Sequence, residues 1–241
     1  MRYAILSDVH GNVESLVQAL SRTRSDDVIV CLGDVVGYGP NPNEVVAILR
    51  DRARHAVLGN HDLAALEGFG VEHFNEAARA AIQWTQEVLD QPARAWLNLL
   101  PYELRFPEFL LVHGAPVAYF EYILDKQDAA AAFDRTDAPI IFVGHTHIAQ
   151  YWTRDADGAI GHKHMQGGGS LEMHTDRRYI VDVGSVGQPR DLNPQASFVL
   201  YEPSLRRIEW LRYDYSIEEV QRKMRAAGLP RYLVDRLSRG R

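Results

Sequence analysis

The sequence has little of three features that would each define a class of protein. Cys31 is the single cysteine among 241 residues, which excludes an internal disulfide framework and fits a reducing compartment. No apolar run approaches the roughly 18 residues that a membrane-spanning helix needs. Net positive charge is also missing, since the formal charge is -6, and this argues against a nucleic-acid partner held by bulk electrostatics.

The features of a secretory signal are absent as well. Met1 and Arg2 lead directly into an apolar run, without the basic segment, apolar stretch and cleavage site of a signal peptide. We therefore expect a cytoplasmic protein with no membrane partner. Cys31 stands inside the apolar run 28–32, which is typical of a small buried hydrophobe rather than a nucleophile. The sequence carries no pattern that defines an oligomeric state.

Short apolar runs alternate with helical patterns through the first sixty residues. Residues 3–7, 28–32 and 56–58 read as strands, and residues 13–20 repeat apolar side chains at a helical period. A second helix is expected after Asn41-Pro42, because asparagine caps helices and proline suits the first helical turn. This strand–helix order predicts an α/β layered fold. The hydrophobic content of 46% and the lack of a linker or repeat predict one domain over residues 1–241.

The second half of the chain is richer in strands than in helices. Helices are expected at 74–89 and 93–99, and the triple glycine 167–169 is expected to form a turn. Strands are expected at 104–106, 109–112, 140–143, 179–183, 197–201 and 207–213. Several of the later strands are joined by short connections, which is typical of an antiparallel region.

Polar residues that can bind metals or move protons follow five of these strands. Ligands of open α/β sheets bind at this carboxyl-end rim. The residues concerned are Asp8, His10, Asp34, Asn60, His61, Asp62, His113, His145 and His147. Asp8 and His10, like His145 and His147, are two positions apart, so on extended backbone each pair is expected to converge on one site.

The types of side chain indicate which cofactor the rim would hold. Carboxylate, imidazole and amide donors without a thiolate suit Mn, Fe, Zn or Ni, and we expect Mn. Asp34 offers two oxygens and could bridge two cations, so two divalent metal ions are expected.

The five blocks resemble the motif set of the calcineurin-like metallophosphoesterases, which is D-x-H, G-D-x-x-G, G-N-H-[DE], a lone H and G-H-x-H. They run in that order from Asp8 to His147, and the short chain is most similar to the compact prokaryotic phosphodiesterase-like branch. The resemblance implies a four-layer α/β/β/α sandwich with mixed sheets, the metallo-dependent phosphatase fold, with metals between the strand ends.

The resemblance also implies a role for each motif residue. One metal would be held by Asp8, His10, Asp34 and His147, and the other by Asp34, Asn60, His113 and His145. A hydroxide bridging the metals would attack phosphorus, and His61 would protonate the leaving oxygen. Asp62 would orient His61, and Asn60 could also touch the phosphate.

Two departures from related branches bear on the substrate. The serine/threonine phosphatase and dinucleoside tetraphosphatase branches carry an arginine just after the second motif, and none stands between Gly33 and Pro40. Those branches also carry Glu where this chain has Asp62. We therefore favour a phosphodiesterase of small nucleotide-like phosphate esters, with a phosphomonoesterase of small phosphorylated metabolites as the alternative. A non-catalytic protein-binding scaffold is disfavoured because His61 and all seven ligands are present.

Four residues outside the motifs are candidates for substrate contact. Tyr38 could face the cleft or pack under the Gly-Pro turn, and Arg190 could bind phosphate or form a surface salt bridge. Tyr119 and Tyr122 could form a base-stacking wall, although core packing is the more common fate of such tyrosines.

Overall fold

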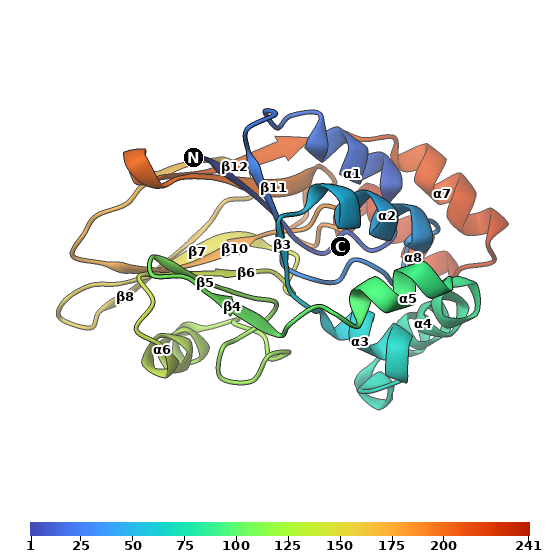
Figure 1. Ribbon diagram of the computed structural model, residues 1–241, viewed down its shortest axis with the longest axis horizontal. Coiled ribbons are helices and arrows are strands. Elements are labelled where there is room, and N and C mark those ends of the chain that lie inside the picture. Colours follow the sequence, from blue (N-terminus) through green and yellow to red (C-terminus); the bar gives the residue numbers. More distant parts are fainter.

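Two six-stranded sheets face each other in the structure, a computed structural model that describes residues 1–241 (Figure 1). The strands of the first sheet are, in spatial order, β3 (His55–Ala56), β2 (Val28–Cys31), β1 (Tyr3–Leu6), β11 (Ala196–Glu202), β12 (Arg207–Tyr213) and β9 (Gly169–Glu172). The three N-terminal strands run parallel to one another, and β11, β12 and β9 continue the sheet with antiparallel pairing.

The second sheet is also mixed. Its strands are, in spatial order, β4 (Glu103–Arg105), β5 (Phe109–Val112), β6 (Ile140–Val143), β10 (Arg178–Val183), β7 (Ala149–Arg154) and β8 (Ile160–His164). The central three, β5, β6 and β10, are parallel. β4 pairs with β5 and β7 pairs with β10 in antiparallel fashion, and β8 adds to β7, also antiparallel. Its parallel strands and those of the first sheet bring the expected rim residues together.

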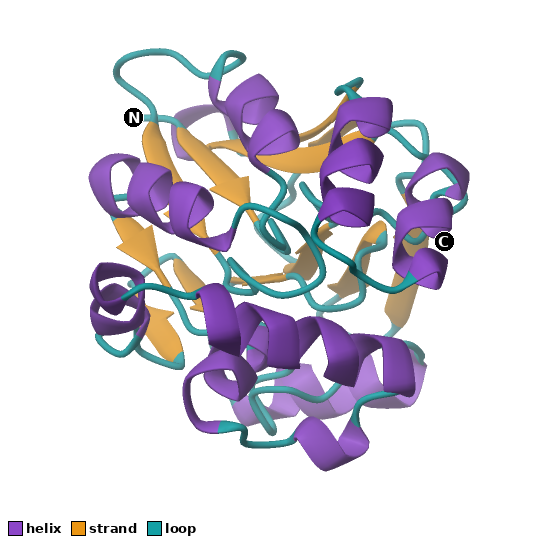
Figure 2. Cartoon of the chain, turned by 90° about the vertical axis from the view of Figure 1, so that its right-hand side faces the viewer, coloured by secondary structure: helices purple, strands orange, loops and turns teal.

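Helices cover the outer faces of both sheets (Figure 2). α1 (Val13–Leu20) and α2 (Pro42–Arg52) pack on the first sheet, and α6 (Lys126–Arg135) packs on the second. The other helices are α3 (Asn60–Glu67), α4 (Glu76–Val88), α5 (Gln91–Leu97), α7 (Ile217–Ala226) and α8 (Arg231–Arg236), with 3₁₀ turns η1 (Val71–His73), η2 (Pro203–Leu205) and η3 (Leu237–Arg239). These layers form the α/β/β/α sandwich that the sequence predicts. No helix is long and apolar enough to cross a membrane.

Alternation along the strands divides the core into layers. In β1, Ala4 and Leu6 pack among the helices on the outer face, and Ile5 packs between the two sheets. Phe142 and Trp210 occupy the same inter-sheet layer from opposite sheets. Each large apolar side chain buried in this way contributes about 1.5–3 kcal/mol to folding.

Several of the expected elements agree with the structure, whereas the apolar run 56–58 does not form the expected strand, because β3 covers only His55–Ala56. Helix 13–20 and strands 109–112, 140–143 and 207–213 have the expected bounds, and Cys31 is fully buried in β2. The helices α3 and α6 and the strands β7, β8 and β9 were not expected. Four of the five residues of β8 are exposed, so it is held by pairing with β7 rather than by an apolar face.

Candidate metal centre

The carboxyl ends of the parallel strands bring the rim residues to one place between the sheets. Asp8 and His10 follow β1, Asp34 follows β2, and His113 and His145 follow β5 and β6. Because β1 and β2 are parallel, as are β5 and β6, the ends of each pair lie at one sheet edge. The packing of the two sheets then places both sets of side chains around a common centre.

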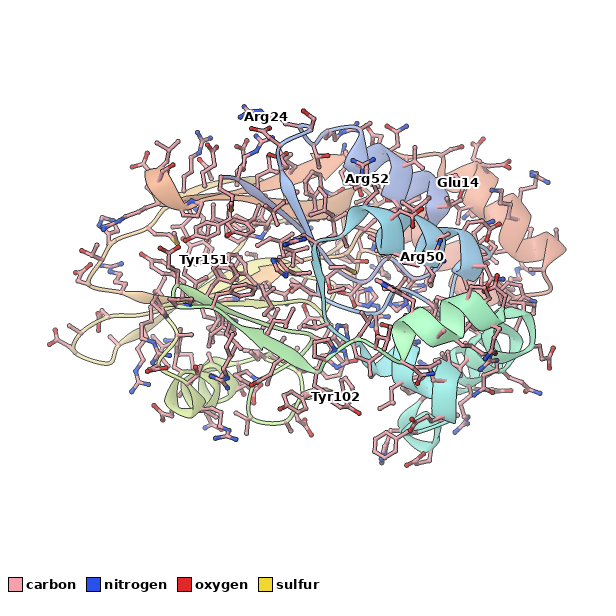
Figure 3. The ribbon with its side chains drawn as sticks, viewed as in Figure 1. Glu14, Arg24, Arg50, Arg52, Tyr102 and Tyr151 are labelled. Carbon is pink, nitrogen blue, oxygen red and sulfur yellow. The ribbon has the colours of Figure 1, made fainter.

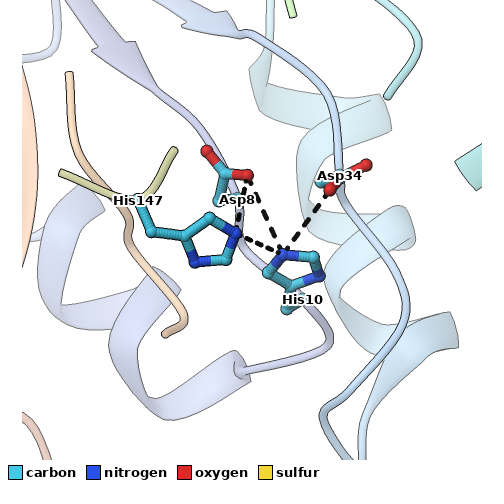
Figure 4. A group of neighbouring side chains, drawn as sticks. All are labelled: Asp8, His10, Asp34 and His147. Carbon is cyan, nitrogen blue, oxygen red and sulfur yellow. Dashed lines mark hydrogen bonds and ion pairs between the residues drawn. The ribbon is translucent and has the colours of Figure 1, made fainter. Parts of the chain in front are cut away.

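Four of these side chains form a first cluster, consisting of Asp8, His10, Asp34 and His147 (Figure 4). Nε2 of His147 lies 3.1 Å from Oδ1 of Asp8 and 3.2 Å from Nε2 of His10. Nε2 of His10 lies 3.6 Å from Oδ2 of Asp34. All four residues are at most 2% exposed, so their donor atoms face one another in a buried space.

A second cluster shares Asp34 with the first and adds His113 and His145. Nε2 of His113 lies 3.4 Å from Oδ2 of Asp34 and 3.1 Å from Nδ1 of His145. The side-chain oxygen of Asn60 lies 3.1 Å from the same His113 nitrogen, so the amide belongs to this cluster as well. One carboxylate oxygen therefore stands between two sets of donors.

The hydrogen bonds of the imidazoles test whether these donors fit a cation. Nδ1 of His10, His113 and His147 lies within 3.0 Å of the backbone carbonyl of Val36, Leu32 and Gln188, respectively. A carbonyl only accepts, so each Nδ1 carries a hydrogen, and each ring in its neutral form turns an Nε2 lone pair towards the centre. Lone pairs at such short range repel unless a cation lies between them. The residues therefore fit divalent metal ions.

Buried polar atoms without partners point to the same conclusion. Oδ1 of Asp8, Oδ2 of Asp34 and Nε2 of His145 are buried and make no hydrogen bond. Native proteins rarely leave such atoms unsatisfied unless a water or ion binds there. These three atoms supply coordination sites that the protein itself does not fill.

The electrostatics of the centre set the protonation of the histidines. Burial lowers the pKa of His145 to about 3, with the charge of His113 adding to the effect. Burial also lowers the pKa of His147, and the nearby charge of Arg190 acts in the same direction. His113 differs: burial opposes its charge, but Asp34 outweighs that effect and raises its pKa to about 9. In the absence of a cation, a proton on His113 thus compensates the shared carboxylate.

Backbone strain is concentrated at this centre. Left-handed backbone is uncommon for residues other than glycine and often marks functional sites. Eight such residues are left-handed, and five of them are cluster members: Asp8, His10, Asp34, His145 and His147. Neither two-apart pair lies on the expected extended backbone, although Asp8 and His10 do converge on the first cluster. His145 and His147 belong to different clusters, which contradicts the spacing argument and agrees with the ligand sets that the resemblance implies.

A side-chain hydrogen bond holds the loop that carries His145 and His147. The Thr146 hydroxyl donates to the carboxylate of Asp182 at 2.5 Å, and the Gly184 backbone N–H donates to the same carboxylate at 3.1 Å. Burial raises the pKa of Asp182 well above its usual range, despite these donors. The sequence analysis did not single out Asp182, although a lone acid inside the apolar strand 179–183 is a signal of such a role.

His61 lies beside the first cluster at the start of α3. Its backbone N–H donates to Oδ1 of Asp34 at 2.8 Å, and its ring centroid lies 4.9 Å from that of His10. The ring is enclosed by Tyr38 and Phe74, with centroids at 4.3 and 4.6 Å. Burial lowers the pKa of His61 to about 4.

Asp62 has a different role from the one expected. Its two carboxylate oxygens accept hydrogen bonds from the backbone N–H groups of Val36, at 3.0 Å, and Gly59, at 3.1 Å. Nδ1 of His61 has no hydrogen-bond partner. The expectation that Asp62 orients His61 directly is therefore wrong. The Asp62 carboxylate instead joins the loop of the second motif, through Val36, to the loop of the third motif, through Gly59.

Two of the four substrate candidates outside the motifs, Tyr38 and Arg190, lie next to each other. The guanidinium of Arg190 lies 5.5 Å above the ring of Tyr38 and donates to the Gln188 side chain at 3.1 Å. Its Nε is buried without a partner, and its backbone N–H donates to the carbonyl of His147 at 3.1 Å. Arg190 forms no salt bridge, so a cation without an anionic partner stands beside the centre.

An α/β/β/α sandwich with a candidate metal centre between its sheets defines the class of metallophosphoesterases, and comparison with known proteins agrees. The family model of the calcineurin-like phosphoesterase superfamily domain matches residues 1–204. The chain therefore belongs to this superfamily, which supports phosphoester hydrolysis at a divalent metal site.

Two solved structures and one curated protein are similar over the whole chain. A metallophosphoesterase from Sphaerobacter thermophilus is 39% identical, with a TM-score of 0.90 and full coverage of both chains. A hypothetical protein from Pyrococcus horikoshii is 19% identical, with a TM-score of 0.79 over 100% of this chain and 98% of that one. An uncharacterized protein of Methanocaldococcus jannaschii is 34% identical over 99% of this chain and 98% of its own.

Proposed function

We propose that the protein is a dinuclear metal-dependent phosphodiesterase of small nucleotide-like substrates. Asp8, His10, Asp34 and His147 would hold one cation, and Asp34, Asn60, His113 and His145 the other. The observation that carries the proposal is the single Asp34 carboxylate between two sets of buried donor atoms. Manganese is the proposed metal, because the donors are carboxylates and imidazoles without a thiolate. A cytoplasmic location is proposed from the cysteine usage.

The chemistry divides between the cations and the chain's own residues. When bound, two divalent cations activate a water molecule near neutral pH and stabilise the charge on the phosphoryl oxygens. His61 donates a proton to the departing oxygen, and such a step contributes about 10²–10⁴-fold to the rate. An anionic phosphoester beside His61 favours the protonated ring, which offsets the lowering of its pKa by burial.

The residues around His61 bind the phosphate. The unpartnered Nε of Arg190 would donate to a phosphoryl oxygen, and the Asn60 amide would approach it from the second cluster. Tyr38 holds the guanidinium from below and packs against His61. A diester carries one negative charge at neutral pH, which the cations and one arginine are sufficient to neutralise.

A second candidate function rests on Arg190. A monoester carries up to two negative charges and gains more from a nearby guanidinium. The presence of Arg190 next to the clusters supports a phosphomonoesterase of small metabolites as the alternative, in spite of the missing arginine after the second motif.

The experiment compares two leaving groups and two ester classes. Metal-stripped protein refilled with Mn²⁺ is assayed with bis-p-nitrophenyl phosphate, p-nitrophenyl phosphate and a dinucleotide whose leaving group is not activated. We expect the diesters to have the higher kcat/KM. His61→Asn should lower the rate on the dinucleotide by about 10²–10⁴-fold and have a much smaller effect on the nitrophenyl diester, which needs little protonation.

The matched control is His164→Asn, which changes an exposed histidine of β8. If the protein hydrolyses only the monoester, the proposed diesterase activity is wrong and the monoesterase alternative is favoured. An equal loss on both diesters in His61→Asn would refute the proton-donor role. No turnover with any metal would favour the protein-binding scaffold.

A further inference from the structure

A cleft of about 720 Å³ opens beside the second cluster, and both Asn60 and His145 contribute to its wall. Its aromatic lining consists of Phe69, Phe74, Tyr102, Tyr119, Phe120 and Tyr122. These side chains come from three separate parts of the chain: the α3–α4 connection, the residue before β4 and the loop after β5. Tyr102 is labelled in Figure 3. The fold therefore assembles an aromatic surface at the edge of the metal centre.

Four of the six aromatic residues that line this cleft are exposed, which is unusual for such side chains. Five aromatic side chains of the chain are exposed: Phe69, Tyr102, Tyr119, Tyr122 and Tyr232. All but Tyr232 line the cleft. Core packing, the common fate of tyrosines, is therefore wrong for Tyr119 and Tyr122. Exposed apolar surface gathered in one place marks a binding site.

The rings are arranged as stacking surfaces. Tyr122 lies flat on His145, with centroids 3.9 Å apart and an angle of 15° between the planes. Tyr102 and Tyr119 are stacked at 5.1 Å and 14°. Planar aromatic ligands bind to such rings through their faces, and nucleobases do so with little dependence on sequence.

The charges assign different parts of a substrate to different parts of the site. No lysine or arginine lines the cleft, and Glu121 is its one carboxylate. A second phosphate is thus disfavoured there, whereas an exocyclic amino group could donate to Glu121. Arg190 lies over Tyr38 and is not among the residues that line the cleft. The phosphate therefore belongs at the clusters and the uncharged, planar part of the substrate in the cleft.

Phe74 indicates that the cleft receives the leaving group of the phosphoester rather than the group that stays on the phosphate. It lines the cleft and packs against the His61 ring at 4.6 Å. His61 is the proposed donor to the departing oxygen, so a group that occupies the cleft is attached to that oxygen.

We infer that the aromatic cleft binds the base of a nucleoside that forms the leaving group of the phosphoester. This inference rests on the proposed function, because it takes the metal clusters as the phosphate site. The inference goes beyond the hydrolysis of phosphoesters because it assigns to the cleft a specificity for leaving groups with a planar aromatic base.

The test measures ligand binding rather than turnover, with a nucleotide that keeps the ester bond between the nucleoside and the phosphate. Isothermal titration calorimetry of the Mn²⁺-loaded protein compares adenosine 5′-monophosphate with ribose 5-phosphate, which has the same phosphate and sugar but no base. We expect the nucleotide to bind about 5- to 140-fold more tightly, the range that base stacking provides. Tyr102→Leu combined with Tyr119→Leu, the stacked pair that does not touch His145, should remove most of that difference and leave ribose 5-phosphate binding unchanged.

Two further variants separate stacking from loss of structure. Tyr122→Phe keeps the ring and should keep the nucleotide preference. Tyr232→Leu removes the exposed aromatic residue outside the cleft and should change neither affinity. Equal affinities for the two ligands, or no binding of either, would overturn the inference. Hydrolysis of the nitrophenyl diester by the same preparation would show that the proposed function survives that result, and its absence would show that both fail.

Discussion

Removal of the metal ions should lower the thermal stability of the protein by a large and reversible amount. A ligand that binds only the native state stabilises it by about 2.7 kcal/mol at 100 times its Kd and by about 4.1 kcal/mol at 1,000 times its Kd. A chain of 241 residues shifts its Tm by about 2–4 °C for each kcal/mol. The expected loss on chelation is therefore about 5 to 16 °C for each of the two ions. The buried donors of Asp8 and Asp34, left without partners, are the structural source of this loss.

Differential scanning calorimetry checks this prediction. The protein is dialysed against a chelator, scanned, refilled with Mn²⁺ and scanned again. Asp34→Asn removes the charge shared by the two clusters and should abolish most of the recovery. Asp176→Asn, a change of an exposed acid in the turn before β10, should recover like the unmodified protein. An identical Tm before and after chelation, with metal loss verified by elemental analysis, would refute the reasoning.

Three further predictions concern single residues. Cys31 should resist a thiol reagent until the chain unfolds, because burial raises the pKa of its thiol; rapid labelling of native protein would contradict this. Thr146→Val leaves Asp182 without its hydroxyl donor and should lower the free energy of unfolding in urea by about 1–3 kcal/mol, so an unchanged midpoint would count against it. Gly59→Ala places a methyl inside van der Waals contact with the shared carboxylate, and should weaken metal binding in a chelator competition where Gly167→Ala does not.

The sequence predicts the parts of the fold that depend on apolar patterning. Strand 109–112 is fully buried and helix 13–20 presents one apolar face, so their bounds follow directly from the periodicity. β8 and β9 were not predicted because their residues are mostly exposed, and only pairing with neighbouring strands makes them extended. α6 has few large apolar residues, but the Asp125 side chain caps it, and that signal was available.

The candidate site divides in the same way. The resemblance to the metallophosphoesterases implies that Asp34 joins two groups of donors, and the structure brings these side chains together in two clusters that share Asp34. The left-handed backbone of His145 and His147 depends on tertiary packing, so their separation into two clusters did not follow from spacing. The partners of Asp62 lie in another loop and could not be read from its neighbour His61.

A titration of diester hydrolysis against metal tests the central claim most directly. Metal-stripped protein at fixed concentration receives increasing Mn²⁺, and the initial rate on bis-p-nitrophenyl phosphate is measured at each step. Two clusters that share Asp34 predict no rate without metal and a plateau at two equivalents per chain. A plateau at one equivalent, or a rate that does not depend on metal, would contradict the dinuclear account.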